Sequence, residues 1–186
     1  MTDARSRGKI GAMDKSKLAE TQGPLKSQYK DDPESAVVTL KADGDVDGSG
    51  IACRVQTAQA MAEAGLHPAT GGDGTQLCSG DMLLEALVAC AGVTLRAVST
   101  SMGVDVRGGS VHAEGDLDFR GTLGVAKDAP VGFREIRLRF DLDTDADADT
   151  LATLHKLTER YCVVFQTLAK PPELSVELAP RQTASA

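Results

Sequence analysis

Alternation of apolar and charged residues predicts two strands in the second half of the chain. In "FREIRLRFDLDT", Ile136, Leu138 and Phe140 alternate with charged residues, which is the period of a strand with one buried face. The stretch 111–119 of "GSVHAEGDLDFRG" repeats this alternation. Because both strands have one polar face, we expect an antiparallel pair with that face toward solvent.

Two longer patterns predict helices. Residues 80–102 include "MLLEALVACAGV", which is apolar on nearly every face, and Gly103 follows as a typical residue after a helix end. We expect Ser79 to cap this helix and the helix to lie inside the protein. A second helix is predicted over about 149–168, where apolar residues recur along one stripe. The segment 173–179, "ELSVELA", is predicted to close the fold as a strand.

The first third of the chain predicts turns and short strands. We expect strands within "AVVTLKADG" and "GSGIACRVQTA". The segment between them imitates half of a calcium-binding loop, but Arg54 stands where a bidentate Glu is needed, so we interpret it as a turn. Residues 1–35 are polar, and we expect them to form an arm or a short helix, with residues 36–180 forming one domain. The separation of strands and helices along the chain predicts an α+β fold. The apolar helix needs more cover than one sheet face offers, which suggests a homodimer.

Composition narrows the functional classes. The net charge of −7 and an aromatic content of 3% argue against a nucleic-acid-binding protein, which needs a basic surface and stacking residues. The longest apolar run, residues 82–93, is shorter than the ~20 residues that span a bilayer, and it contains Glu85. The first residues lack the apolar core of a secretory signal. We therefore expect a cytoplasmic protein with neither a membrane nor a nucleic-acid partner.

The cysteines are the candidate reactive groups: Cys53, Cys78, Cys90 and Cys162. They form no CxxC pair and the histidines lie far apart, so the sequence predicts no metal site. Cys90 and Cys162 each lie on a helix face expected to be buried, where a cysteine is either a small core residue or a reactive thiol. If the helices bring both sulfurs within disulfide distance, a sulfenic acid on one condenses with the other. Cys78, just before a helix, stays a third candidate.

The stretches "DMLLEALVACAGVTLRAVSTSMGVDV" and "LTERYCVVFQTL" resemble the OsmC/Ohr-like family, the osmotically inducible protein C and organic hydroperoxide resistance proteins. The resemblance covers residues 37–178. It implies an α+β OsmC-like fold with antiparallel sheets, a buried central helix that carries Cys90, and an intertwined homodimer. It also implies a cofactor-free thiol peroxidase that reduces organic hydroperoxides, with Cys90 as the attacking thiol and Cys162 as the resolving thiol. A dithiol reductant such as a lipoylated protein would regenerate it.

The chain departs from the family pattern around the first cysteine. Residues 78–80 read Cys, Ser and Gly where the family has Asn, Pro and Glu, and the first hairpin lacks the family's arginine. Asp81, Glu85 and Arg54 are the candidates for the supporting roles, and Arg5 or Arg7 of a second subunit is another source of a cation. The alternative is a non-catalytic OsmC-like protein that binds an apolar ligand at the dimer interface.

Overall fold

Helices and strands occur in separate runs, as predicted for an α+β fold. The structure is a computed structural model that describes residues 14–31, 43–45, 52–56, 61–124 and 126–179. In chain order the elements are α1 (Lys15–Asp31), β1 (Asp43–Asp45), β2 (Ala52–Gln56), β3 (Met61–Gly65), η2 (Pro68–Thr70), β4 (Leu77–Cys78), α2 (Ser79–Met102), β5 (Gly108–Leu117), α3 (Phe119–Thr122), β6 (Phe133–Asp143), α4 (Ala148–Tyr161) and α5 (Val163–Ala169).

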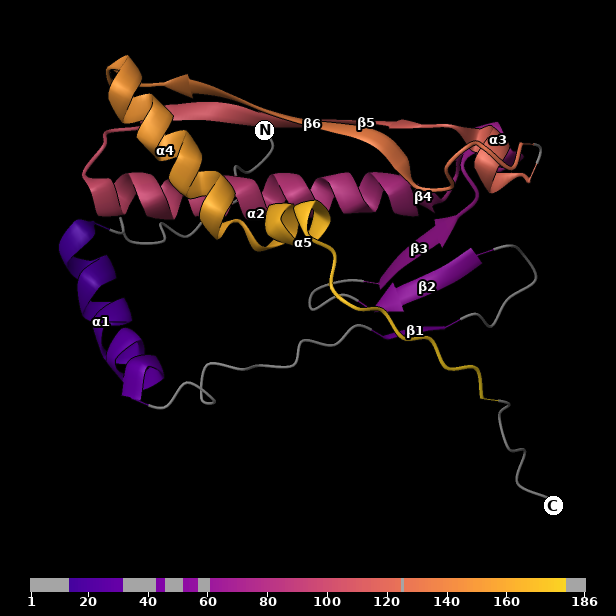
Figure 1. Cartoon of the computed structure of the whole chain (residues 1–186), viewed down its shortest axis with the longest axis horizontal. Coiled ribbons are helices and arrows are strands. Elements are labelled where there is room, and N and C mark those ends of the chain that lie inside the picture. Colours follow the sequence, from indigo (N-terminus) through magenta and orange to yellow (C-terminus); the bar gives the residue numbers. More distant parts are fainter. Residues whose placement is uncertain (1–13, 32–42, 46–51, 57–60, 125, 180–186) are drawn as a thin grey trace, which may run out of the picture.

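The hairpin of β5 and β6 covers α2 along its length (Figure 1). It is antiparallel with Val111 opposite Phe140, which confirms the predicted strand pair. The apolar side chains of both strands pack toward α2, while the outer face carries ion pairs such as Arg137 to Asp116 at 2.6 Å. The helices α4 and α5 lie on the same side of the hairpin as α2. The site described below therefore lies in one layer of helices under one sheet.

A second sheet has the strand order β1-β2-β3-β4 and lies near the N-terminal end of α2 (Figure 1). In the calcium-like segment, β1 and β2 pair antiparallel with Asp45 opposite Arg54, which agrees with a turn between strands. Residues 46–51 of that segment lie outside the described part of the structure. The sequence analysis missed β3 and β4, because "MAEAG" consists of residues with weak strand preference.

The central helix α2 ends as predicted and begins one residue earlier. Gly103 adopts the left-handed conformation, φ 74°, and closes the helix. Ser79 is the first helical residue, and Cys78 occupies the N-cap position without a side-chain cap, so the prediction of Ser79 as the cap is wrong. A buried stripe repeats every fourth residue and packs against β5, α4 and α5: Leu87, Ala91, Leu95 and Ser99.

The opposite face of α2 is open in the isolated chain. The side chain of Val93 is 72% exposed, and Leu83 is also exposed. The described residues thus cover one stripe of this central core helix and leave the opposite face without cover. By length and composition α2 is the one helix among the described residues that meets the requirement for crossing a membrane, but the core helix of a soluble fold meets it too. Its packing against three elements identifies it as such a core helix.

The C-terminal part differs from the sequence prediction at two points. The predicted helix 149–168 is interrupted at Cys162, whose φ of −74° and ψ of 107° are extended. Residues 173–179 form no strand, because no edge in the described part of the chain pairs with them. Leu174, Val176 and Leu178 are almost fully exposed, which leaves an alternating apolar segment uncovered.

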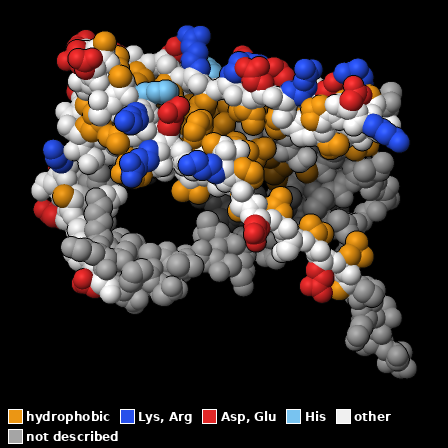
Figure 2. All heavy atoms as spheres, viewed as in Figure 1, with side chains coloured by type: hydrophobic (Ala, Val, Ile, Leu, Met, Phe, Trp, Pro, Cys, Tyr) orange, Lys and Arg blue, Asp and Glu red, His pale blue; other side chains and the backbone are white. Residues whose placement is uncertain are grey.

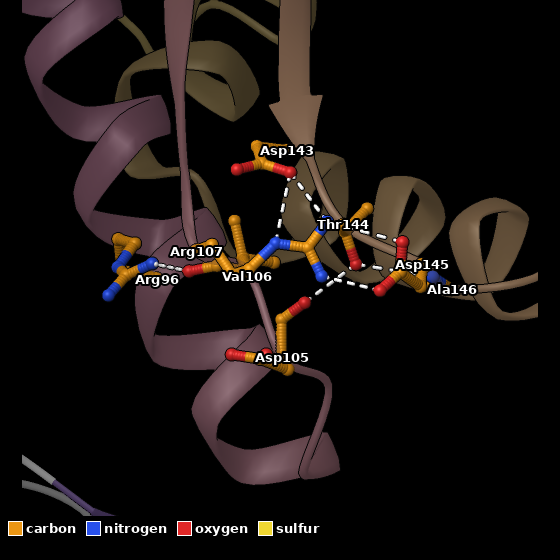
Figure 3. A network of polar contacts seen from close by, with 8 residues as sticks. All are labelled: Arg96, Asp105, Val106, Arg107, Asp143, Thr144, Asp145 and Ala146. Atoms are coloured by element: carbon orange, nitrogen blue, oxygen red, sulfur yellow. Dashed lines mark hydrogen bonds and ion pairs between the residues drawn. The ribbon is translucent and has the colours of Figure 1, made fainter.

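Polar contacts fasten the turn after α2 to the end of β6 (Figure 3). The guanidinium of Arg107 donates to Asp143 at 2.6 Å and also pairs with Asp145. Arg96 of α2 donates to the carbonyl oxygen of Val106. These contacts fix the position of α2 along the hairpin and therefore the level at which Cys90 meets its neighbours.

Candidate functional site

The thiols of Cys90 and Cys162 meet between α2 and the break separating α4 from α5. Their side chains are hydrogen-bonded to each other. Cys162 is 1% exposed, whereas Cys90 is half-buried. Both pack in one apolar cluster with Leu87 and Ala91. Two residues that are seventy-two positions apart in the sequence are thus neighbours in space.

The environment of Cys90 favours its thiolate. Burial by itself raises the pKa of the Cys90 thiol, because a low-dielectric surrounding disfavours the charged form. Hydrogen bonds from the amide of Val164, the side chain of Cys162, the amide of Val163 and the side chain of Thr94 outweigh burial and hold the pKa of Cys90 below its ordinary value. These donors are amides, a thiol and a hydroxyl, and none of them is a guanidinium.

The environment of Cys162 favours its protonated form. Burial is the largest influence and raises the pKa of the Cys162 thiol. The amide of Phe165 opposes this, while the negative charge that develops on Cys90 raises the pKa further. The two thiols are therefore unequal: Cys90 is the better nucleophile at neutral pH, and Cys162 stays protonated and donates to it.

The break at Cys162 supplies the amide donors. In a continuous helix the amides of Val163 and Val164 would bond to carbonyl groups of the preceding turn. Because the backbone of Cys162 is extended, α5 starts anew at Val163 and its first amides are free to point at Cys90. Sequence reasoning missed these donors, since a backbone amide leaves no mark in the residue pattern. The sequence carries one signal for Thr94 as a neighbour of Cys90, because it lies four residues later on the same helix face.

The other predicted site residues lie elsewhere. Asp81 and Glu85 are both exposed on α2. Asp81 precedes Cys90 by nine residues, and at about 100° per residue this places it on the opposite side of the helix. Arg54 lies in β2, where the side chain is outside the described part of the structure, as are Arg5 and Arg7.

The thiol of Cys78 lies apart from the Cys90–Cys162 pair, at the N-terminal end of α2. Cys78 is half-buried at the start of α2, about 18 Å from Cys90 along the helix axis. Cys53 lies in β2, and its side chain is outside the described part. Among the described residues, no three His, Cys, Asp or Glu side chains are placed to hold a metal ion. The arrangement offers thiol chemistry on one pair of sulfurs.

A groove runs between β6 and the helices α4 and α5, and we call it the β6–α4 groove. Its central cavity of ≈ 220 Å³ is lined by residues that include Cys162, His155 and Glu159. A neighbouring hollow of ≈ 370 Å³ shares Leu138, Phe140 and His155 with it. Figure 2 shows hydrophobic side chains gathered in the hollow between α4 and the hairpin, below a row of charged side chains. The groove is thus a depression with apolar and polar lining residues that reaches Cys162 of the thiol pair.

Comparisons with known proteins identify the family and the fold of the chain. The sequence profile of a family described as OsmC-like protein matches residues 72–177. No curated protein sequence matches the chain. The fold is similar to an OsmC-like protein from Mycoplasma pneumoniae, with a TM-score of 0.59 and 14% identity over 72% of this chain and 89% of that one.

Two further structural neighbours carry a functional name. An organic hydroperoxide resistance protein from Elizabethkingia anophelis has a TM-score of 0.59 and 13% identity, over 73% of this chain and 91% of that one. An organic hydroperoxide resistance protein from Legionella pneumophila has a TM-score of 0.57 and 16% identity, over 73% and 92%. At these identities the matches establish a shared fold.

Proposed function

The chain belongs to the OsmC-like protein family and has its α+β fold, and from this premise we propose that it is a thiol peroxidase that reduces organic hydroperoxides. The observation that carries the proposal is the hydrogen-bonded thiol pair with opposite pKa shifts. A peroxidase of this type needs one nucleophilic thiolate and one protonated thiol within reach of it. Cys90 has the first property and Cys162 the second.

The proposed reaction has two steps on this pair. The Cys90 thiolate attacks one oxygen of the hydroperoxide, an S–O bond forms, the O–O bond breaks, and the alcohol leaves after taking up a proton. The product is a sulfenic acid on Cys90. The Cys162 sulfur then attacks that sulfur, a disulfide forms, and the oxygen leaves as water with the proton of Cys162. The amides of Val163 and Val164 stabilise the negative charge on the Cys90 sulfur before it attacks.

Substrate class and partners follow from the surroundings of the pair. Cys90 and Phe165 both pack against the buried cluster of Leu87, Ala91 and Cys162. An apolar surface of this kind favours organic over inorganic peroxide. Structural neighbours named organic hydroperoxide resistance proteins support the same class. Regeneration by a dithiol reductant, such as a lipoylated protein, and a cytoplasmic location belong to the proposal.

We further propose a homodimer. Val93 on the open face of α2 and the alternating Leu174, Val176 and Leu178 leave apolar surface that a monomer exposes to water. A segment that alternates like a strand but finds no partner edge among the described residues fits a pairing site on a second copy. Such a copy would also cover α2 next to Cys90.

The test is a titration of reduced protein with less than one equivalent of cumene hydroperoxide, with hydrogen peroxide in parallel. We expect a rapid Cys90–Cys162 disulfide in the peptide map, formed faster by the organic oxidant. A slow reaction without this bond would refute the peroxidase. It would favour the alternative, a non-catalytic OsmC-like protein that binds an apolar ligand between its subunits. The β6–α4 groove, whose lining includes Leu138 and Phe140, is the observation that supports this alternative.

A further inference from the structure

The backbone amide of Val163 donates to the thiol pair instead of to the preceding helix. In a continuous helix each amide donates to the carbonyl oxygen four residues earlier, so Val163 would donate to Glu159. At the break before α5 the Val163 amide donates to the sulfur of Cys90 instead. The carbonyl oxygen of Glu159 therefore needs another donor, because a partly buried carbonyl group without a partner destabilises the fold.

Gln166 of α5 supplies that donor. Its side-chain Nε2 donates to the carbonyl oxygen of Glu159 at 2.8 Å, and the side chain is half-buried there. The two residues are seven positions apart, which in a continuous helix is about 10.5 Å along the axis and beyond the reach of a Gln side chain. The bond therefore depends on the extended backbone of Cys162, and it joins the end of α4 to α5.

The main chain of Gln166 belongs to the same arrangement. Its amide donates to the carbonyl oxygen of Cys162 at 2.9 Å, and this bond starts α5. The amide of Cys162 donates to the carbonyl oxygen of Thr158 at 3.0 Å, and this bond ends α4. The three amides between these two donors face the sulfurs of the thiol pair. Gln166 thus fastens both sides of the break, one with its main chain and the other with its side chain.

We propose that Gln166 is a positioning residue for the Cys90 thiolate: its side chain takes the place of the Val163 amide at Glu159 and so keeps that amide directed at Cys90. The inference rests on the proposed function, because it gives Gln166 a part in preparing the attacking thiol. Without this side chain, the carbonyl oxygen of Glu159 competes with the Cys90 sulfur for the Val163 amide, and the thiolate loses a donor.

The other groups around the pair remain in place when Gln166 is substituted. The titratable partner of the Cys90 sulfur is Cys162. From α4, His155 and Glu159 line the cavity next to Cys162, and the His155 Nε2 lies 3.6 Å from the Glu159 carboxylate. The side chains that β5 and β6 pack against the cluster are apolar: Val111, Ala113, Ile136, Leu138 and Phe140. A change in the ionisation of Cys90 on substitution of Gln166 therefore reports the loss of an amide donor.

A double-mutant cycle tests the path from Gln166 through the Val163 amide to Cys90. Gln166→Met keeps the length of the side chain and removes its donor. Val163→Pro removes the amide itself, and proline suits the first position of a helix after an extended residue such as Cys162. The readout is the pH dependence of Cys90 alkylation by iodoacetamide in reduced full-length protein, followed on the Cys90 peptide by mass spectrometry.

We expect Gln166→Met to move this profile to higher pH and to slow alkylation at neutral pH by about fivefold, the effect of one hydrogen bond. Val163→Pro should have an effect at least as large, and Gln166→Met should add nothing to it in the double variant. Gln76→Met is the matched control: it removes a side-chain amide bond to Glu63 of 2.6 Å, ahead of α2, and should keep the parent profile. Equal shifts by Gln166→Met in both backgrounds, or no shift in either, would overturn the inference.

Amide NMR provides a second measurement, which does not depend on the proline variant. In 15N-labelled protein the amide resonance of Val163 should follow the ionisation of Cys90, and in Gln166→Met it should cease to do so. A resonance that follows Cys90 equally in both proteins would overturn the inference. Neither measurement uses a peroxide. A coupled effect of Gln166 in a protein inert to hydroperoxide therefore refutes only the proposed function, and an uncoupled effect in an active peroxidase refutes only this inference.

Discussion

The side chain of Cys162 is hydrogen-bonded to the sulfur of Cys90 across the break between α4 and α5. The same break frees the amides of Val163 and Val164 to donate to that sulfur. One irregular residue thus supplies both the second thiol and the donors that activate the first. This arrangement accounts for a nucleophilic Cys90 in a chain whose first hairpin lacks the family's arginine.

Replacement of each thiol should separate the two steps of the reaction. We expect Cys90→Ser to abolish consumption of cumene hydroperoxide, since the nucleophile is gone. Cys162→Ser should still react once and accumulate a sulfenic acid on Cys90, which dimedone traps for mass spectrometry. Cys78→Ser is the control and should retain turnover. Loss of turnover in Cys78→Ser with retention in Cys90→Ser would reverse the assignment.

The pH dependence of Cys90 should reflect its stabilised thiolate. The pKa of Cys90 is lowered, so its thiolate is present at a pH where an ordinary thiol is still protonated. The rate of alkylation by iodoacetamide should therefore rise with pH and level off below the pH at which free cysteine levels off. Cys162→Ala removes a donor and should move this profile to higher pH, whereas Cys162→Ser retains a donor and should move it less. An unchanged profile in Cys162→Ala would contradict the contribution of that hydrogen bond.

Thr94 should contribute measurably to the reactivity of Cys90. Its side chain is hydrogen-bonded to the Cys90 sulfur from the next turn of α2. A hydrogen bond of about 1 kcal/mol corresponds to about a fivefold change in rate. We expect Thr94→Val to raise the pKa of Cys90 and to slow reaction with hydroperoxide at neutral pH by about this factor, while Thr94→Ser stays close to the parent. A loss in Thr94→Val that is the same at all pH values would indicate a packing effect instead.

The core under the hairpin should be sensitive to truncation. Leu154 of α4 is 1% exposed and packs with Leu95 and Val106. Leu154→Ala should lower the free energy of unfolding by about 2–5 kcal/mol, because it leaves a cavity. Urea denaturation followed by circular dichroism measures this. Val131→Ala, at an exposed position, is the control and should change stability by less than about 0.5 kcal/mol.

The open face of α2 should be the place where a second copy binds. Val93→Lys puts a charge on this face, and we expect it to convert the dimer into a monomer in sedimentation velocity experiments. Val131→Lys, at another exposed position but in the loop before β6, should leave the dimer intact. A parent protein that sediments as a monomer, or a Val93→Lys variant that stays dimeric, would contradict the proposed interface.

The residue pattern alone determined the parts of this protein in which local preference and packing agree. Three local signals correspond to elements of the structure: the apolar run of α2, its end at Gly103, and the alternation in β5 and β6. The pattern also singled out Cys90 and Cys162 as the thiols on buried helix faces. It could not reveal β3, because alanine and glycine residues form a strand there only beside β2 and β4.

Tertiary structure decided the features on which reactivity depends. The pattern of "LTERYCVVFQTL" predicts one continuous helix, and only the structure reveals the break at Cys162. The donors to Cys90 are backbone amides, which every residue carries, so no choice of side chain encodes them. Likewise "ELSVELA" has the pattern of a strand but pairs with no edge in the described part of the chain. A strand forms only where a second strand lies beside it, and the segment's own sequence does not determine that. Residue patterns report local preference, whereas these features depend on what the rest of the fold places opposite them.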